Sequence, residues 1–419
     1  MLNTLKIDDV CEVLITGLEN EGKGVCKVGG MICFVPKVLP GEKVKIRITE
    51  IKKNFARGKV IEILEKSKQR VEPNCPYYNE CGGCDLRHQS YEDSLLFKKE
   101  KVETALKRIG KVDVKVEDVI SCVKTDNYRN KMSFKVEDNK IGFYEEGTYR
   151  LINIDKCNLA ENRINELLKQ IKNYLEENKS EVKTITIRQS NIVGDLLVDI
   201  YSTNEDDNGL VSYLLINSES INSIIFNDKL VYGNGYVNEI TNGLMFKVSN
   251  KSFFQVNSTQ VEKLYSKAIE LAKLSKDDVA LDLYCGTGTI TSIVAGYVKK
   301  VIGIEIVEDA IKDAKENLIT NNINNVRFIC GDAAKEISKI KEKIDVVFVD
   351  PPRKGIDRKA IAIMKKLSPK KIIYISCNPV TMSRDISYLT DLYDVKKVVP
   401  VDMFPNTAHV ECICLLERR

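Results

Sequence analysis

The spacing of hydrophobic and polar positions changes along the chain and predicts separate regions. From residue 1 to about 62, short apolar and alternating runs are broken by Gly24, by the pair Gly29 and Gly30, and by Pro40 and Gly41. These runs are CEVLITGL, GVCKV, MICFVPKV, EKVKIRITEI and ARGKVIEIL. Five short strands in so little sequence predict a small, OB-like Greek-key β-barrel over residues 1–62.

A mixed pattern follows and predicts a central α+β domain over residues 63–248. Apolar positions at helical spacing run through 91–110 and stop at Gly110, which predicts a helix. The segments KMSFKV, KIGFYEE and LLVDIYS alternate like strands, whereas AENRINELLKQIKNYLEE has the period of an amphipathic helix.

From about residue 249 to 419, Val- and Ile-rich runs alternate with helical stretches. The runs are VALDLYC, VKKVIGIE, NVRFIC, KIDVVFVD and KIIYISC. Such runs, separated by helices, predict a parallel, doubly wound α/β sheet of the Rossmann-like kind that is buried on both faces. Ligands of such sheets bind at the carboxyl ends of the strands.

Composition and charge narrow the possible functions. The 419 residues are 43% hydrophobic and 30% charged, which predicts a folded, multidomain protein. The net charge is only +4, so a uniformly basic coat is excluded. Residues 37–70 nevertheless hold 11 Lys or Arg and 4 Glu, a local excess of +7. This excess indicates an RNA-binding patch on the barrel, the alternative being an ordinary solvated lysine-rich surface.

The N-terminal residues and the cysteine count indicate a cellular compartment. Asp8, Asp9 and Glu12 stand where a signal peptide would need an apolar core, and no run approaches the length of a membrane span. We therefore expect a cytoplasmic protein without a membrane partner. Thirteen cysteines in a reducing compartment suggest thiol ligands or nucleophiles, and only two histidines make histidine-based chemistry improbable.

Three cysteines lie within ten residues of polar, glycine-rich sequence and predict a metal site. Cys75, Cys81 and Cys84 need a fourth ligand, for which Cys122 and Cys157 are candidates, the latter in a polar turn. All-sulfur coordination suits zinc or an iron-sulfur cluster. A zinc ribbon usually shows two CxxC pairs, and the single pair here favours the cluster.

The loop after the first strand of the C-terminal region, residues 282–289, indicates a nucleoside-bearing cofactor. Its sequence DLYCGTGT lacks the third glycine of a dinucleotide fingerprint and the Gly-Lys-Ser/Thr of a phosphate loop. Glu305 ends the second strand, where a carboxylate can bind ribose hydroxyls, and Asp332 ends the third. S-adenosylmethionine fits this layout better than NAD. The alternative is that both carboxylates only cap helices.

The fourth and fifth strands end in polar motifs at the same edge of the sheet. Asp350 begins DPPRKG, and Cys377 lies in SCNP, where Pro379 ends the strand. A thiol exposed there is a candidate nucleophile if cations lower its pKa, and Arg353, Lys354 and Arg384 are within reach along the sequence. The alternative for Cys377 is a small buried hydrophobic residue.

Glu411 begins the closing strand and is a candidate general base. Its same-face neighbours are Ile413 and Leu415, and apolar surroundings raise a carboxyl pKa toward neutrality. The alternative is a solvated glutamate on an edge strand.

The motifs DLYCGTGT, DPPRKG, ISCNPVTMSRD and DMFPNTAHVE match, in order and spacing, the RNA uracil-5-methyltransferase family. With the barrel and the cysteines, the chain resembles the ribosomal-RNA branch, which carries a TRAM domain and a 4Fe-4S iron-sulfur cluster. The resemblance implies Cys377 as nucleophile, Glu411 as base and Asp350 as a further residue that holds the uracil edge and the cofactor together. It implies cluster ligation by Cys75, Cys81, Cys84 and Cys157. It places around S-adenosylmethionine the residues Gln255, Tyr284, Thr289, Glu305, Asp332 and Asp350, with Asn common among relatives at the position of Thr289.

The function implied by this resemblance is methylation of C5 of a specific uridine in 23S ribosomal RNA, through a covalent adduct of Cys377 with C6. We expect a monomer whose helix near 91–110 packs on the catalytic domain. The transfer-RNA branch is expected to lack both barrel and cluster. The rival hypotheses are cytosine-5 methylation, which uses two cysteines, and a cluster-bearing RNA-binding or redox protein with a vestigial methyltransferase half.

Overall fold

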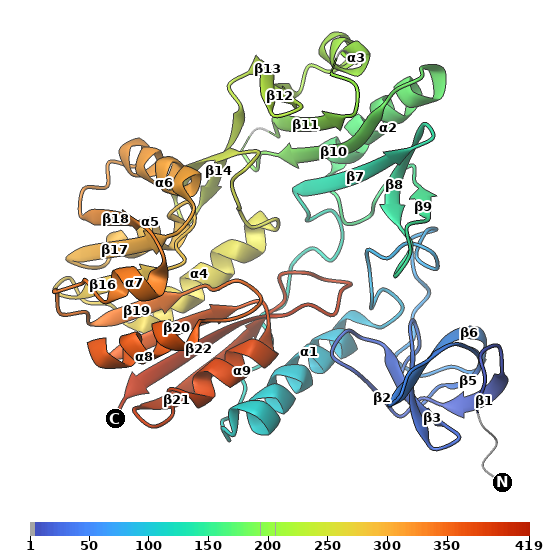
Figure 1. Cartoon of the computed structure of the whole chain (residues 1–419), viewed down its shortest axis with the longest axis horizontal. Helices are drawn as coiled ribbons and strands as arrows, with labels where there is room; N and C mark the ends of the chain where they lie inside the picture. The colour runs from blue at the N-terminus through green and yellow to red at the C-terminus, as the bar shows by residue number, and fades with distance from the viewer. Residues whose placement is uncertain (1–4, 193, 206) are drawn as a thin grey trace. The chain divides into compact units, whose positions relative to one another are not determined.

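The computed structural model describes residues 5–192, 194–205 and 207–419 (Figure 1). Residues 1–4, with which the expected barrel domain begins, lie outside the described residues. The chain forms two compact units. The first unit comprises Met1–Lys101, Phe143–Ile152 and Phe404–His409, and the second comprises Val102–Gly142, Asn153–Met403 and Val410–Arg419. Both units are assembled from discontinuous segments. The division expected from the sequence, into consecutive domains at 1–62, 63–248 and 249–419, stays a prediction.

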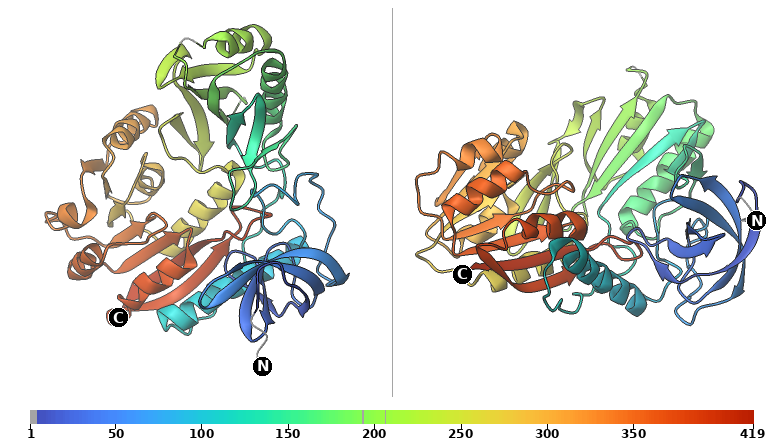
Figure 2. Two further views of the ribbon diagram at one scale, coloured as in Figure 1. Left: turned by 45° about the vertical axis from the view of Figure 1, so that its right-hand side comes forward. Right: turned by 60° about the horizontal axis from the view of Figure 1, so that its bottom comes forward.

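The first unit contains a six-stranded sheet with the order β1-β5-β6-β4-β3-β2 (Figure 2). Its strands are β1 (Val10–Leu14), β2 (Gly17–Leu18), β3 (Gly24–Val28), β4 (Met31–Val35), β5 (Lys43–Ile51) and β6 (Phe55–Glu65). Along β5, the side chains of Val44, Ile46 and Ile48 are fully buried and alternate with charged residues. The period of two therefore places apolar side chains in the core and cations outside. The five predicted runs form strands, and the first of them, CEVLITGL, is divided between β1 and the two-residue strand β2.

A buried ion pair ties this sheet to the segment that follows it. Arg70 donates two hydrogen bonds to Glu42, of 2.5 and 2.9 Å, and a third to the carbonyl of Lys37. Lys37 in turn donates to the carbonyl of Tyr78 at 2.6 Å. Two of the eleven cations in the predicted basic patch thus stabilise the unit internally, and the surface excess is smaller than the sequence indicated.

Most of a second, seven-stranded sheet belongs to the second unit, and its strand order is β13-β12-β11-β10-β7-β8-β9. The residues Phe143–Ile152, which include the end of β8 and the start of β9, are assigned to the first unit. The strands of this sheet are β7 (Lys131–Glu137), β8 (Lys140–Tyr144), β9 (Leu151–Asn153), β10 (Val182–Gln189), β11 (Leu196–Ser202), β12 (Ile221–Phe226) and β13 (Lys229–Gly233). Helices α2 (Asn162–Glu177) and α3 (Gly209–Asn217) accompany it, and a separate hairpin follows, formed by β14 (Tyr236–Thr241) and β15 (Leu244–Ser249). The predicted strands β7, β8 and β11 and the amphipathic helix α2 are confirmed.

The second unit also contains the predicted doubly wound sheet, with the order β18-β17-β16-β19-β20-β22-β21. Its strands are β16 (Val279–Leu283), β17 (Lys300–Glu305), β18 (Val326–Cys330), β19 (Val346–Val349), β20 (Lys371–Ser376), β21 (Tyr393–Val401) and β22 (Glu411–Arg418). The first five in this order pair in parallel, and β22 lies antiparallel between β20 and β21. The chain order reverses on either side of β16, so the carboxyl end of β16 is the topological switch point at which such sheets bind ligands.

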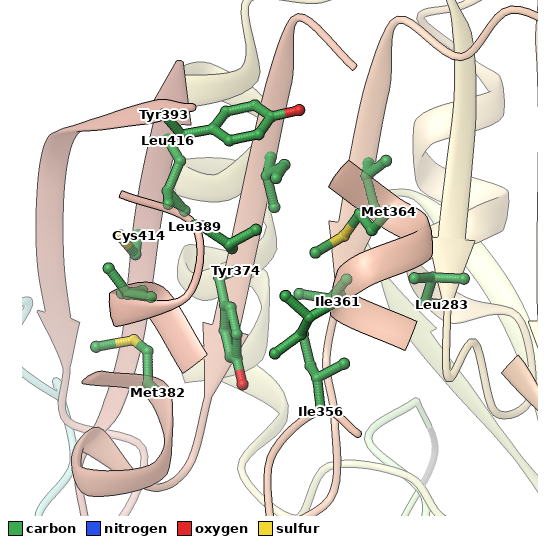
Figure 3. Close-up of a cluster of buried hydrophobic side chains, with 14 of the residues drawn as sticks. Leu283, Ile356, Ile361, Met364, Tyr374, Met382, Leu389, Tyr393, Cys414 and Leu416 are labelled. Carbon is green, nitrogen blue, oxygen red and sulfur yellow. The ribbon is translucent and has the colours of Figure 1, made fainter. Parts of the chain in front are cut away.

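Helices cover both faces of this sheet (Figure 1). They are α4 (Ser258–Ala272), α5 (Thr289–Ala295), α6 (Glu308–Thr320), α7 (Ala333–Ile337), α8 (Arg358–Leu367) and α9 (Pro379–Ser387). Figure 3 shows one packed face, where Ile361 and Met364 of α8 and Met382 of α9 meet Tyr374 of β20.

The helix predicted over 91–110 consists of α1 (Tyr91–Ala105) and a π-helical turn, η1 (Leu106–Gly110). Val102 and Leu106 belong to the same buried cluster as Met382 of α9. Leu96 and Ile109 are two of the apolar residues at helical spacing that predict this helix, but they are 57% and 39% exposed. Among the described residues, no helix is both long and apolar enough to cross a membrane.

Candidate active site

The loop after β16 has the backbone that its glycines predict. Gly286 and Gly288 have φ values of 52° and 76°, in the left-handed region that favours glycine. A Cβ atom on Gly288 would lie 2.8 Å from the ring of Phe328 and 3.1 Å from Ala314. Helix α5 can therefore start directly behind β16, with buried Thr289 as its first residue. Tyr284, the residue after β16, is half-buried, and burial raises its pKa to about 12.

The two carboxylates at the next strand ends differ in their local bonding. Glu305 ends β17, and its carboxylate accepts hydrogen bonds from the backbone N–H groups of Gly286, Ile306 and Val307 at 3.1, 2.8 and 2.9 Å. It therefore joins the glycine loop to the turn before α6. Asp332 accepts from the backbone N–H of Lys335 at 3.1 Å and caps α7. The alternative interpretation, a helix cap, thus describes Asp332 better than Glu305.

The ends of three neighbouring strands of the second unit, β19, β20 and β22 (Figure 1), carry Asp350, Cys377 and Glu411. Asp350 follows β19, Cys377 follows the neighbouring strand β20, and Glu411 begins β22 on the other side of β20. Ser376 pairs with Cys412, so the antiparallel register places Cys377 opposite Glu411. Strand ends far apart in sequence thus place a thiol and two carboxyl groups side by side.

Burial dominates the protonation of this cluster. It raises the pKa of Glu411 to about 8, and the charge of Asp350 adds to the rise. It raises the pKa of Asp350 to about 7, although this residue keeps some exposed surface. Glu411 is only 3% exposed and lies on an interior strand, so the alternative of a solvated edge-strand glutamate is wrong. Both carboxyl groups titrate near neutrality, as a general acid or base requires.

The thiol itself is not activated by a cluster of cations. Burial, then Glu411 and Asp350, raise the pKa of Cys377 to about 11, and Arg353 acts in the opposite direction. Arg384, expected to lower this pKa, forms an ion pair with Asp385 at 2.7 Å and donates to the carbonyl of Lys354. Cys377 is half-buried rather than fully buried, so its sulfur is not simply a core hydrophobic group.

The turn that carries Arg353 is bonded to the turn that follows Cys377. Its carbonyl accepts hydrogen bonds from the Asn378 side-chain amide at 3.2 Å and the Thr381 hydroxyl at 3.1 Å. Asn378 also caps α9, with Pro379 in the first turn. The turn that follows Cys377 and the turn that carries Arg353 are therefore joined.

Two further groups face this cluster and were not found by the sequence analysis. Tyr265 of α4 is buried, and its pKa is raised well above its usual range by burial and by the charges of Asp350, Glu411 and Asp282, while Gln255 acts in the opposite direction. Asp282 of β16 accepts a hydrogen bond from the Thr291 hydroxyl at 2.5 Å, and burial raises its pKa to about 7. The helical periodicity of α4 marks Tyr265 only as a core position.

The three cysteines of the segment 75–84 are not arranged as a metal site in the described part of the chain. Cys75, Cys81 and Cys84 belong to the first unit and Cys157 to the second. In the part of the chain that the structure describes, no group of three or more His, Cys, Asp or Glu side chains is arranged to hold a metal ion. Burial raises the pKa of the Cys81 thiol, and the nearby Cys75 adds to the rise.

The alternative fourth ligand, Cys122, is buried and has other contacts. Its sulfur lies 3.0 Å from the carbonyl of Lys124 and 3.4 Å from the side-chain amide of Asn257. Cys157 lies in the polar turn expected for it, where Asn165 bonds its backbone N–H and carbonyl at 2.8 and 3.0 Å.

The doubly wound sheet, the glycine loop after β16 and a cysteine near two carboxyl groups are features of an α/β enzyme that binds a nucleoside-bearing cofactor. Comparison with known protein families identifies which family this is. The model of the tRNA (uracil-5-)-methyltransferase family matches residues 90–419, and that of the TRAM domain matches residues 6–61. The chain therefore belongs to the tRNA (uracil-5-)-methyltransferase family of RNA methyltransferases and carries a TRAM domain. The predicted family, barrel and catalytic fold are confirmed.

Bacterial relatives match over almost the whole chain. An uncharacterized RNA methyltransferase of Caldanaerobacter subterraneus is 39% identical over 451 residues, covering 100% of both chains. Another, from Clostridium tetani, is 37% identical over 446 residues, covering 98% of this chain and 97% of the relative.

A solved structure changes one inference about the substrate. The tRNA (uracil-54, C5)-methyltransferase of Pyrococcus abyssi, in complex with S-adenosyl-L-homocysteine, superposes with a TM-score of 0.81 at 25% identity. The match covers 97% of this chain and 99% of that one, so the unmatched 3% is too short to contain the barrel. A fold that includes the barrel thus occurs in a transfer-RNA enzyme, and the barrel does not argue against that substrate.

Proposed function

We propose that this protein methylates C5 of a specific uridine in 23S ribosomal RNA, acting as a cytoplasmic monomer with S-adenosylmethionine as methyl donor. The observation that carries the chemistry is the juxtaposition of Cys377, Glu411 and Asp350 at the edge of the doubly wound sheet. The cofactor would lie between the glycine loop and the ends of the neighbouring strands. Its binding residues would be Gln255, Tyr284, Thr289, Glu305, Asp332 and Asp350.

The cofactor supplies an electrophilic methyl group on a sulfonium, and the residues of this chain prepare the acceptor. Uracil C5 is too weak a nucleophile to react unaided. The Cys377 thiolate adds to C6, which forms a sulfur–carbon bond and an enolate that is electron-rich at C5. After C5 has gained the methyl group, Glu411 removes the C5 proton. The bond between C6 and sulfur then breaks, and the thiolate leaves with its electron pair.

The first proton transfer must take the Cys377 proton away, because its pKa of about 11 leaves little thiolate at neutral pH. Asp350, with a pKa of about 7, is the neighbouring group that accepts it, which leaves the Glu411 carboxylate free to take the C5 proton. Arg353 favours the thiolate over the thiol. Asp350 would additionally hold the uracil edge beside the cofactor.

The exposed cations of the barrel support an RNA substrate. They include Arg47, Lys53 and Lys59, which lie on the outer faces of β5 and β6 and the turn between them. A uridine must leave its stack to reach a half-buried thiol, and this is less costly in a single-stranded loop.

Transfer RNA is the second candidate substrate, favoured by the likeness to the Pyrococcus abyssi enzyme. The test separates both RNA fractions from cells with and without this protein and maps 5-methyluridine by mass spectrometry. Loss of one methylated site in 23S RNA supports the proposal. Loss only at a transfer-RNA site would assign the second substrate. Product carrying 5-methylcytosine would establish cytosine-5 methylation, and absence of any methylated product would favour the vestigial RNA-binding or redox hypothesis.

A 4Fe-4S cluster ligated by Cys75, Cys81, Cys84 and Cys157 is part of this proposal. The donor set suits iron and sulfide, and the Gly83 N–H donates to the Cys81 sulfur at 3.4 Å, a contact of the kind that cluster sulfurs accept. The support for the cluster comes from the spacing of the cysteines in the sequence, because their side chains are not arranged around a metal position. The cluster would join the segments that carry its four cysteine ligands, which is a structural role. We assign it no step of methyl transfer.

A further inference from the structure

A buried polar network lies in the second unit, outside the groups assigned to the reaction. Arg188 of β10 is 2% exposed, Glu239 of β14 is fully buried, and Asn130, just before β7, is 2% exposed. The Arg188 guanidinium lies 3.9 Å from the Glu239 carboxylate, and the Asn130 amide donates to that carboxylate at 2.9 Å. Buried charges are costly unless they are paired and hydrogen-bonded, so this arrangement needs an explanation.

The network bonds one short segment at three points, two on its backbone and one on a side chain. Arg188 donates to the carbonyl of Phe254 at 3.3 Å. The backbone N–H of Asn130 donates to the carbonyl of Val256 at 2.9 Å, and its side-chain amide donates to the Ser258 hydroxyl at 3.0 Å. The network therefore holds the chain between β15 and α4, immediately before and after Gln255.

Gln255 connects this segment to the proposed active site. Its side chain lies close to Tyr265 and lowers the pKa of that phenol, whereas the charges of Asp350 and Glu411 raise it. Gln255 is only 8% exposed, so its side chain cannot reorient freely once the backbone on both sides is bonded. A small displacement of this backbone would move the amide relative to a bound cofactor.

We propose that Arg188, Glu239 and Asn130 are positioning residues that hold the segment 254–258, and with it Gln255, in the geometry that binds S-adenosylmethionine. This inference rests on the proposed function, because it takes Gln255 as a cofactor residue. Arg188 supplies the bond to Phe254, Glu239 provides the opposite charge 3.9 Å from the guanidinium, and Asn130 bonds both Glu239 and the segment.

The test measures binding of S-adenosylhomocysteine by calorimetry, with the full chain and without RNA. Arg188→Lys keeps the charge but loses the forked guanidinium. We expect its Kd to rise roughly ten- to hundredfold, because displacements of about 1 Å have effects of this size. In a steady-state methylation assay, saturating cofactor should recover most of the rate. The KM for the cofactor should therefore rise while kcat falls only slightly.

The double variant with Arg188→Met and Glu239→Gln guards against misfolding, because it leaves no isolated buried charge. It also lacks the bond to Phe254, and should melt cooperatively while binding S-adenosylhomocysteine as weakly as Arg188→Lys. Ile185→Val is the matched control. Ile185 is fully buried on the same strand, and the substitution should lower the melting temperature without changing Kd.

The outcomes separate the two proposals. If Gln255→Ala weakens binding but both Arg188 variants bind like the wild type, the positioning inference is wrong and the proposed function stands. If the wild type fails to bind S-adenosylhomocysteine, or if Gln255→Ala binds it normally, the cofactor assignment itself fails and the inference fails with it.

Discussion

Cys377 and Glu411 lie opposite each other across the antiparallel strands β20 and β22, one residue beyond the pair Ser376 and Cys412. Glu411 also raises the pKa of Cys377, which is the electrostatic sign of their proximity. A thiol that adds to one carbon of a uracil ring and a base that removes a proton from the adjacent carbon must lie this close. The register of one strand pair therefore places the two ends of the proposed reaction.

Exchange of the proposed base should trap the reaction after methyl transfer. Glu411→Gln retains the thiol, so addition and methyl transfer can occur while loss of the C5 proton slows. We expect a covalent protein–RNA species that resists denaturant and carries the methyl group, detected by gel electrophoresis and mass spectrometry. Cys377→Ala should bind RNA and cofactor but form neither adduct nor product. Turnover of Glu411→Gln at the native rate, or an adduct that maps to Cys285 or Cys412, would refute the assigned roles.

The same substitution should change stability in a pH-dependent way. Burial raises the pKa of Glu411 from 4.5 to about 8, so between these values the unfolded chain releases a proton that the folded chain retains. The stability contributed by this group is therefore complete below pH 4.5 and is lost as the pH rises through 8. Gln cannot ionise, so Glu411→Gln should be more stable than wild type at pH 8.

The gain at pH 8 should be on the order of a few kcal/mol, since each pKa unit is worth about 1.4 kcal/mol. It should shrink toward pH 5. Urea unfolding at both values measures it, with Glu417→Gln at the outer end of β22 as control. A gain that does not depend on pH would show that Glu411 titrates normally in the folded protein.

Methylation should accelerate as the pH rises through neutrality. Glu411 must be ionised to remove the C5 proton, and with a pKa of about 8 it is mostly protonated at pH 7. The single-turnover rate of product formation should therefore increase roughly 15-fold from pH 6.5 to 8 and level off only above about pH 9. A rate that is constant over this range would exclude Glu411 as the limiting base.

Iron should accompany the protein when it is purified without oxygen. We expect a brown protein with broad absorption near the visible edge, and Cys81→Ala should remove both the colour and the iron. Cys330→Ser, an exposed cysteine outside the proposed ligand set, should leave them unchanged. Stoichiometric zinc without iron would replace the cluster by a zinc site.

The barrel should contribute to RNA binding through charge. Substituting Arg47, Lys53 and Lys59 by Gln should reduce the log-log slope of affinity against salt by about 0.7 for each single-strand phosphate that the barrel no longer neutralises. Binding of S-adenosylhomocysteine should be unaffected. Lys299→Gln, an exposed cation in the second unit, is the control. Point substitutions are preferable to deletion of residues 1–62, because Glu42 and Arg70 tie the barrel to the rest of its unit. An unchanged slope would make the patch an ordinary solvated surface.

The sequence by itself determined the elements and the chemistry of the motifs. Alternating residues along β5 and continuous apolar runs such as β16 and β20 are local patterns that follow from burial on one or two faces. The motifs around Cys377 and Glu411 likewise carried their chemistry in residue type and spacing. Only the tertiary structure decided which charges act where. Arg384 forms an ion pair with Asp385, and Arg70 forms one with Glu42. Tyr265 lies near the carboxyl groups of the site, although the periodicity of its helix indicates only a core position. Protonation and ion pairing depend on burial and on neighbours distant in the chain, so a sequence pattern names the groups while packing decides how they interact.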